Sequence, residues 1–422
     1  TSYRYDVMGN PIGEIDHYGN ETEFVYDAHN RCIEIKRPTI ASLDGKIEKP
    51  ILYKEYDECD NLTCEIDAQG GITRSQYNAF GKPVALTHAD GSQEFMRYDL
   101  YNRLVEKTER NGSKKVYEYD ALGRVLEERI LDRDDSVLCI KSNVYDAFNL
   151  ISSTDAMGLT TTYTYDYAGR LLSQKTGEKC LSKSYDALGH LASETLHHGE
   201  MTKVSRFFYD FKNQLLETVI EDVMGNPLER TSIEYDQEGR KKLVRQYRQE
   251  GSYSTRIEYD VLDRTVEVVL PNGISFYAFY EDRFVNVAGQ TVARKCLLSP
   301  NGHQVFTTFD TWGRAVCTEE YRLDSLLHKK EQNYDLNDHC LWERFLVTTP
   351  GKASRTVINA FTYDTLGNLV EQIEGLSDPK QRITSYTYDL NGQKASYTKS
   401  DGIKIYYEYD ALGRLLREFS SD

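Results

Sequence analysis

A tyrosine-aspartate dipeptide recurs along the whole chain and constrains the fold more than any other feature. Alignment on it gives sixteen copies, and two degenerate copies, Tyr280-Glu281 and Phe309-Asp310, bring the number to eighteen. Spacings cluster at 20 to 21 residues and stretch to 24 to 30 where extra residues fall between turns. A short fixed period predicts a repeat array rather than the two or three domains that 422 residues would otherwise suggest. The sixteen copies begin at Tyr5, Tyr26, Tyr56, Tyr77, Tyr98, Tyr119, Tyr145, Tyr165, Tyr185, Tyr209, Tyr235, Tyr259, Tyr334, Tyr363, Tyr388 and Tyr409.

The fullest copies read YDALGR, at Tyr119 to Arg124 and at Tyr409 to Arg414. The aspartate is expected to accept hydrogen bonds from backbone N–H groups one to three residues on, and the glycine to supply the positive φ of a tight reversal. Tyrosine before the turn and Arg-Leu after it then belong to strands. The structural positions of the motif are Tyr98, Asp99, Tyr119, Asp120, Gly123, Arg124, Tyr165, Asp166, Gly169, Arg170, Tyr185, Asp186, Gly189, Tyr363, Asp364, Gly367, Tyr409, Asp410, Gly413 and Arg414.

A second reversal falls about half a repeat later. Asp90-Gly91, Asn111-Gly112, Asn272-Gly273 and Asp401-Gly402 each lie 12 and 13 residues after the motif aspartate or its Asn78 counterpart. Asp-Gly and Asn-Gly are strong hairpin signals, so one repeat reads strand, turn, strand, turn. The sequence therefore predicts an all-β fold: an antiparallel β-hairpin repeat solenoid of about 36 strands, with almost no room for helix.

Side-chain alternation and composition predict a thin sheet. Leu159, Thr161, Tyr163 and Tyr165 alternate with threonines, and Ile403, Ile405, Tyr407 and Tyr409 alternate with Lys404, Tyr406 and Glu408. The chain has 32 tyrosines against 15 phenylalanines and 2 tryptophans, which suits half-solvated strands better than a thick core. Because strand twist accumulates, so long a β-strip should spiral into a hollow shell or part of one.

The ends and insertions give two further expectations. We expect the array to occupy residues 1–422 as one domain cut within repeats at both ends, since Tyr5 already ends a strand and Asp422 stands where a turn aspartate would precede glycine. The long insertions from Pro38 to Pro50 and from Thr348 to Arg355 are expected at hairpin tips along the rims.

Tyr-Asp-x-x-Gly-Arg-Leu with an Asp-Gly turn and a period near 21 resembles the RHS/YD-repeat family, and the resemblance covers essentially Tyr5 to Asp422. That family includes bacterial polymorphic RHS toxins, the C subunits of insecticidal toxin complexes, and teneurins. The resemblance implies a β-strip wound into a hollow shell, which in bacterial members holds a C-terminal toxin domain. The core segment with self-cleaving aspartates that follows the repeats in toxin-bearing members is not recognisable here, so the resemblance transfers only structural positions.

Several residue clusters could be metal sites or catalytic sites, and each also has a simpler structural explanation. Cys59 and Cys64 lack a second pair with zinc spacing, His197-His198 precedes Gly199 at an expected hairpin tip, and the acids at 132, 134 and 135 lack the glycine and distal Glu of a calcium loop. An acid that recurs in every repeat fits turn capping better than a glycosidase pair. The eight cysteines occupy no fixed repeat position, which favours free thiols. We expect no catalytic residue, no cofactor and no metal.

The function expected is that of an encapsulating shell segment in a secreted or cell-surface bacterial protein of toxin type. Its partners would be its own C-terminal effector segment and a delivery or shell-closing subunit. The alternative is a carbohydrate- or surface-binding adhesin, which usually needs exposed aromatics, and only Trp312 and Trp342 are tryptophans. A teneurin-like contact protein would share the fold. Interspersed charges with a net −16 argue against nucleic acid, and no apolar run reaches the roughly 20 residues of a membrane span.

Overall fold

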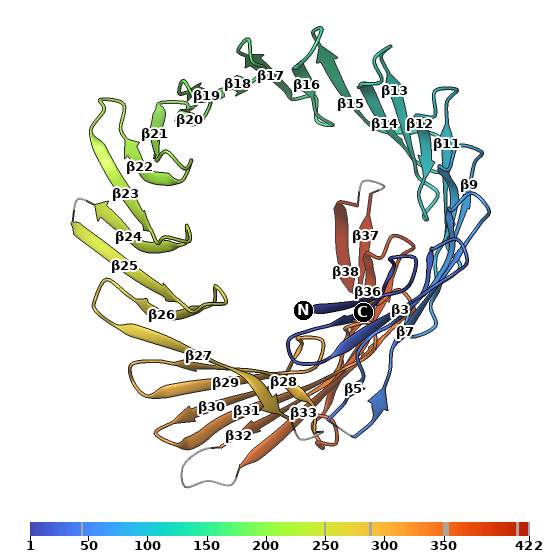
Figure 1. Ribbon diagram of the computed structural model, residues 1–422. Helices are drawn as coiled ribbons and strands as arrows, with labels where there is room; N and C mark the ends of the chain where they lie inside the picture. Colours follow the sequence, from blue (N-terminus) through green and yellow to red (C-terminus); the bar gives the residue numbers. More distant parts are fainter. Residues whose placement is uncertain (44, 249, 287–288, 349–353, 411–412, 421–422) are drawn as a thin grey trace. The chain divides into compact units, whose positions relative to one another are not determined.

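The computed structural model describes residues 1–43, 45–248, 250–286, 289–348, 354–410 and 413–420 (Figure 1). Over these residues the regular structure is entirely β-strand. Thirty-six strands belong to one sheet, and β5 and β6 form a separate two-stranded sheet. The expectation of a long all-β hairpin array is confirmed.

The strands are short and follow one another at nearly even spacing along the chain. The first half of the chain contains β1 (Ser2–Tyr5), β2 (Pro11–Ile15), β3 (Glu21–Tyr26), β4 (Cys32–Lys36), β5 (Ile40–Ala41), β6 (Ile47–Glu48), β7 (Ile51–Tyr56), β8 (Leu62–Ile66), β9 (Ile72–Tyr77), β10 (Pro83–Thr87), β11 (Gln93–Tyr98), β12 (Leu104–Thr108), β13 (Lys114–Tyr119), β14 (Val125–Leu131), β15 (Val137–Tyr145), β16 (Leu150–Thr154), β17 (Thr160–Tyr165), β18 (Leu171–Thr176) and β19 (Lys179–Tyr185). The second half contains β20 (Leu191–His198), β21 (Met201–Tyr209), β22 (Leu215–Glu221), β23 (Pro227–Tyr235), β24 (Lys241–Arg248), β25 (Gly251–Tyr259), β26 (Thr265–Val269), β27 (Ser275–Val285), β28 (Thr291–Leu298), β29 (His303–Phe309), β30 (Ala315–Arg322), β31 (Ser325–Tyr334), β32 (Cys340–Val347), β33 (Arg355–Tyr363), β34 (Leu369–Glu374), β35 (Arg382–Tyr388), β36 (Lys394–Thr398), β37 (Lys404–Tyr409) and β38 (Leu415–Ser420).

Neighbouring strands pair antiparallel in chain order, and β4 pairs with β7 because the intervening insertion carries β5 and β6. Reversals therefore alternate between two edges of the strip. The Tyr-Asp edge consists of the motif turns, such as 120–124 and 166–170. The Asp-Gly edge consists of the turns between repeats, such as 109–113 and 155–159. The prediction of two reversals in each repeat is confirmed.

Turns at both edges commonly share one geometry. In the motif turn, the Asp166 N–H donates to the Arg170 carbonyl (3.0 Å) and the Gly169 N–H donates to the Asp166 carbonyl (3.0 Å). This is a three-residue loop with its last residue in the left-handed region, where Gly169 has φ +76°. At the Asp-Gly edge, Gly112 occupies the same position with φ +87°. The positive φ predicted for the turn glycines is confirmed.

A β-bulge recurs beside the Tyr-Asp turns. In the pairing of β17 with β18, Thr164 lies opposite Ser173 but Tyr165 lies opposite Leu171, so Leu172 is an additional residue. The same irregularity recurs at the motif tyrosine in other repeats. A bulge bends its strand and increases the local right-handed twist, so each repeat adds twist at this edge.

The sheet is thin, as the composition predicts. Few of the described side chains are fully buried, and the apolar ones include Ile40, Cys64, Ile130 and Val292. On β17 the predicted alternation is confirmed for the face of Thr161, Tyr163 and Tyr165, which is more buried than the opposite face. Leu159, just before the strand, is exposed. On β37 both faces are half-buried, so the predicted contrast between them is wrong.

The chain divides into two compact units. Unit 1 comprises residues 1–116, 131–138 and 279–422, and unit 2 comprises residues 117–130 and 139–278. In unit 2 the hairpins from β16 to β26 follow one another side by side along the chain (Figure 1). Unit 1 contains, in addition, contacts between segments far apart in sequence, and these form part of the candidate site.

Candidate functional site: the repeated turn and the seam of unit 1

Each motif turn is built around its aspartate. The Asp120 Oδ1 atom accepts hydrogen bonds from the backbone N–H groups of Leu122 and Arg124, both at 2.9 Å, and Oδ2 accepts from the Arg124 Nε at 2.6 Å. The carboxylate therefore binds N–H groups two and four residues on, and the expected range of one to three residues is too short. The backbone hydrogen bond from Arg124 and the adjacent guanidinium lower the pKa of Asp120 below its usual value.

The other motif aspartates repeat this arrangement. Asp27 is the most strongly shifted, because the Arg31 side chain and backbone N–H lower its pKa to about 2. The predicted positions Asp99, Asp166, Asp186 and Asp364 each accept the N–H groups two and four residues on, and Asp410 accepts the N–H of Arg414. Carboxylates held in this way are turn caps, not a catalytic pair.

The motif tyrosines tie neighbouring repeats together. The Tyr165 hydroxyl donates to the carbonyl of Leu150, the first residue of the strand that follows the preceding motif turn, at 3.0 Å. One hairpin is thus closed by an Asp-Gly turn at one end and by a tyrosine hydroxyl at the other. Burial raises the pKa of Tyr165, so its hydroxyl stays protonated as a donor at neutral pH. The same bond links Tyr98 to Pro83, Tyr185 to Leu171, Tyr235 to Leu215, Tyr334 to Ala315, Tyr363 to Cys340 and Tyr388 to Leu369.

The motif arginines form a second link, which reaches forward to the next motif turn, whereas the tyrosine link reaches back to the preceding repeat. Arg124 donates to the Asp146 carbonyl of the next motif turn at 2.9 Å, and its guanidinium lies 4.5 Å from the centroid of the Tyr145 ring. Arg170 lies 4.7 Å from the Tyr185 ring in the same way. Arg124 is the last turn residue, one position before β14, rather than a strand residue.

These two links were not predicted from the sequence, which suggested only turn-forming roles for the motif. Their signal is nonetheless present, because tyrosine and arginine recur together although a turn requires neither. In repeats where another residue stands at the position of the motif arginine, a different interaction forms the link. His339 stacks on Tyr363 with ring centroids 4.7 Å apart, and the Gln214 Nε2 donates to the Gly239 carbonyl at 3.2 Å.

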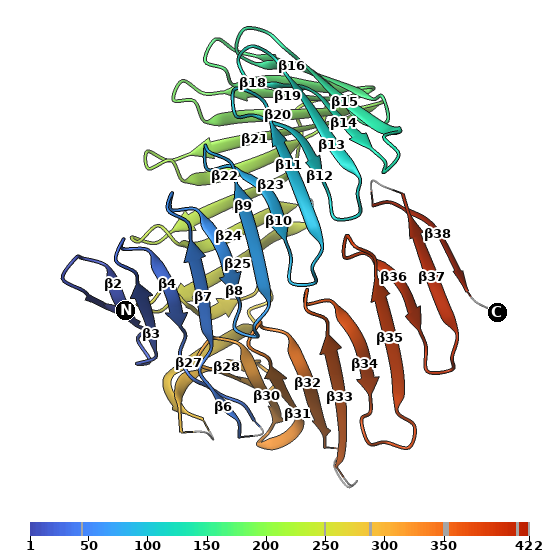
Figure 2. The same ribbon diagram turned by 90° about the vertical axis from the view of Figure 1, so that its right-hand side faces the viewer.

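Unit 1 contains a lateral seam, in which the Tyr-Asp edge of residues 310–392 lies against the Asp-Gly edge of residues 16–113. The Thr39 carbonyl accepts hydrogen bonds from the Gln290 Nε2 (2.8 Å) and the Thr311 Oγ1 (3.0 Å), and the Pro38 carbonyl accepts from the Trp312 Nε1 (3.1 Å). Figure 2 shows the ends of β7 and β9 reaching the strands around β30 and β32.

Each further contact of the seam lies about one repeat further along both edges. Further along, the Asn337 Nδ2 donates to the Asp67 Oδ2 at 3.0 Å. Beyond it a cleft of about 620 Å³ is lined by the motif turn of Leu366 and by the Asp-Gly turns at 67–71 and 88–91. At the next step, a Cβ on Gly392 would lie 3.8 Å from the Arg110 guanidinium. Successive motif turns therefore meet successive Asp-Gly turns in register.

The insertion from Pro38 to Pro50 lies at the Asp-Gly edge between the paired strands β4 and β7, which is the expected place at a hairpin tip. Its first residues are held by the seam, and β5 and β6 fold over the strands β30 and β31. The Trp312 ring lies between the Arg37 and Arg314 guanidinium groups, at 4.9 and 4.7 Å. Part of the second expected insertion, residues 349–353, lies outside the described residues, as does Asp422.

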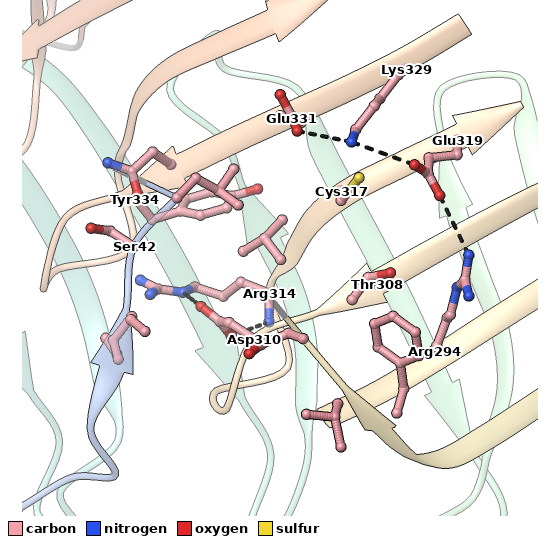
Figure 3. A pocket seen from close by; sticks show the side chains of 18 residues that line it. Ser42, Arg294, Thr308, Asp310, Arg314, Cys317, Glu319, Lys329, Glu331 and Tyr334 are labelled. Carbon is pink, nitrogen blue, oxygen red and sulfur yellow. Dashed lines mark hydrogen bonds and ion pairs between the residues drawn. The ribbon is translucent and has the colours of Figure 1, made fainter. Parts of the chain in front are cut away.

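A cavity of about 250 Å³ lies beneath this insertion, between Ser42 and the strands β28 to β31 (Figure 3). A row of alternating charges lines it, in which Lys329 contacts Glu319 and Glu331 at 3.5 and 3.1 Å. Burial raises the pKa of the Cys317 thiol to about 11, so the thiol is protonated at neutral pH and is a poor nucleophile. Ion pairs join Arg294, Glu319, Lys329 and Glu331 along this row.

The other candidate residues lie apart from one another. Cys59 is exposed in a turn and Cys64 is buried in β8, and all eight cysteines are free thiols. His197 and His198 are exposed at the end of β20, as predicted for a hairpin tip. Over the described ranges, no group of three His, Cys, Asp or Glu side chains is placed to hold a metal ion. Nor does any described helix have the length and apolar character to cross a membrane.

A family model described as RHS Repeat matches residues 98–133 and 145–179. These two segments are RHS repeats by that match. The turn, the tyrosine link and the arginine link within the matched residues recur in repeats outside them.

Solved structures of similar fold include the crystal structure of TcdB2-TccC3-TEV, with 12% identity and a TM-score of 0.46, covering 100% of this chain and 31% of that chain. A chain of the Photorhabdus luminescens Tc holotoxin pore has 13% identity and a TM-score of 0.31, covering 99% and 29%. TcdB2-TccC3 has 12% identity and a TM-score of 0.33, covering 100% and 31%. The RHS chain thus spans about a third of the length of these proteins. Among proteins of curated function, none matches the sequence significantly.

Proposed function

We propose that this RHS-repeat array is a segment of a wall that encloses another polypeptide. The observation that carries the proposal is the seam of unit 1, where the strip lies against itself in register. Within each unit, neighbouring strands of the strip are hydrogen-bonded to one another. In unit 1 the seam covers part of the two edges with turn-to-turn contacts such as Trp312 to Pro38.

The proposed mechanism is steric. A polypeptide enclosed by such a wall is separated from proteases and from its targets, and it lacks the space to fold until the wall opens. We propose that the cargo is a C-terminal toxic or effector segment of the same protein, which is secreted or displayed at a bacterial surface, with a delivery or closing subunit as a further partner. Support comes from the RHS repeats, because the bacterial proteins that this repeat pattern resembles use it for encapsulation.

The fold itself is structural, and we propose that the array performs no catalysis. The motif carboxylates are engaged as turn caps, and Cys317 is protonated in its cavity. The adhesin alternative receives no comparable support. Trp312, one of its two candidate sugar-stacking residues, is held in the seam by Pro38, Arg37 and Arg314.

Enclosure can be tested with a reporter fused after residue 422, a flexible segment that contains one thermolysin site. An enclosing wall predicts that cleavage of the fused reporter is at least about ten-fold slower than cleavage of the free reporter peptide. A matched variant with the seam weakened, Trp312→Ala with Asn337→Ala, should restore most of the cleavage rate. Equal cleavage rates of the fusion and the free peptide would contradict enclosure. A small-angle scattering envelope of the protein that is not hollow would contradict it as well.

A further inference from the structure

The outermost residues of the motif turns distinguish two parts of the Tyr-Asp edge. In the seam of unit 1, Trp312 and Leu366 occupy the second position after the motif aspartate, and both are half-buried against Asp-Gly turns. In unit 2 the same turn position carries Leu122, Phe148 and Leu188, which are 72%, 88% and 80% exposed. The turns of Leu122 and Leu188 have the same geometry as those of Trp312 and Leu366, while the turn of Phe148 is one residue shorter. For Leu122 and Leu188 the difference therefore lies in what covers the turn.

The exposed apolar side chains of unit 2 form a row along one edge. Each motif turn is two strands from the next, which places consecutive tips about 10 Å apart at the usual strand spacing. Isolated exposed apolar residues are ordinary, but a row of them at the first or second position after successive motif aspartates indicates an interaction surface. The tips in this row are Leu122, Phe148, Tyr167, Leu188, Phe211, Val261 and Leu262.

The opposite edge of unit 2 carries complementary groups. Its turns also have exposed apolar tips, Met157, Val223 and Met224. These turns belong to the Asp-Gly edge, whose counterpart in unit 1 receives the motif turns of residues 310–392. The chain therefore presents both halves of a contact that it already makes once within unit 1.

We propose that the Tyr-Asp edge of unit 2 is a docking surface for the Asp-Gly edge of a second copy of this chain. The contact is of the same kind as the seam of unit 1, with apolar turn tips packed against the turns of the other strip in one-repeat steps. Because the two edges differ, the interface is head-to-tail, and it adds copies in sequence rather than closing a symmetric dimer. The surface does not depend on what the wall encloses.

Sedimentation velocity over a range of protein concentrations tests self-association of the 422-residue chain. The edge variant combines Leu122→Asn, Phe148→Asn and Leu188→Asn, since Asn337 and Asn391 already occupy this turn position elsewhere. We expect concentration-dependent association of the unmodified chain and at least about ten-fold weaker association of the edge variant. Circular dichroism checks that the variant is folded.

A matched control removes apolar groups from the strand faces instead, through Val144→Thr, Ile151→Thr and Phe208→Thr, all of which are exposed. Association of this control should equal that of the unmodified chain. A photo-crosslinker at position 188, in a mixture of ¹⁴N and ¹⁵N chains, should join mainly residues 155–158 or 221–226 of the other copy. A monomer at all concentrations, equal association of both variants, or crosslinks to strand faces would overturn the proposal.

Discussion

Replacing Tyr334 by phenylalanine isolates the tyrosine link between repeats. The hydroxyl donates to the Ala315 carbonyl at 3.1 Å, and the ring, under the Arg314 guanidinium at 5.0 Å, remains in the variant. Loss of one neutral hydrogen bond of this kind costs about 0.5 to 1.5 kcal/mol. In an array whose repeats contact mainly their neighbours, that cost should appear as local opening rather than as uniform destabilisation.

Amide hydrogen exchange measures this directly. At RT of about 0.59 kcal/mol, the expected cost raises exchange in β30 and β31 roughly two- to thirteen-fold. Tyr167→Phe is the matched control, because Tyr167 is fully exposed at a turn tip. Exchange that is unchanged in β30 and β31, or raised equally along all described strands, would refute the reasoning.

Three further predictions address the turns and the seam. Since the folded-state pKa of Asp27 is lowered to about 2 from 3.8, its contribution to stability is present above about pH 4 and is lost as the pH falls toward 2. The urea midpoint of the unmodified chain should be constant above pH 5 and fall below pH 4, and it should fall less steeply in Asp27→Asn. The same dependence of the midpoint on pH in both proteins would contradict this. Gly169 has φ +76°, and a Cβ there would meet only the Asn149 Oδ1 atom, at an ordinary contact distance of 3.9 Å. Gly169→Val should therefore lower the free energy of unfolding by about 1 to 2 kcal/mol in denaturant titrations, whereas Gly169→Asn should cost less because asparagine tolerates this conformation. Equal losses in the two variants would argue against backbone strain. Trp312→Phe removes the hydrogen bond to the Pro38 carbonyl and should speed proteolysis within residues 38–50, while Trp342→Phe should not; equal rates would show that the bond does not hold the insertion.

Much of the fold follows from local chemistry that is visible in the sequence. The Asp-x-x-Gly spacing specifies a three-residue loop, because Gly123 must adopt φ +82° and Asp120 must cap the N–H groups that the loop exposes. Both reversals of the repeat were predicted for this reason, and with them the antiparallel hairpin array. Charge and composition excluded other classes of protein without fixing any contact.

The links between repeats were not predicted, because their partners lie outside the turn. Nothing local requires the Tyr165 hydroxyl to reach Leu150, or Arg124 to reach Tyr145. Both contacts depend on the twist that brings one repeat over the next. The recurrence of the two residue types was visible, but the direction in which they act required coordinates.

The seam is the feature least predictable from the sequence, because it joins residues more than 250 positions apart whose types are common in turns. Asn337 and Asp67 are typical turn residues, and each lies in a turn, so neither residue type indicates that the two side chains meet. Which turns meet is decided by how much twist each repeat adds, and a small error per repeat, carried over a dozen repeats, shifts the contact to another turn. The Pro38 insertion and Trp312 act against such a shift, since the three hydrogen bonds to Pro38 and Thr39 fit one register only. An atypical insertion and an atypical turn are therefore complementary parts of one contact, and their departure from the repeat is the signal that they meet.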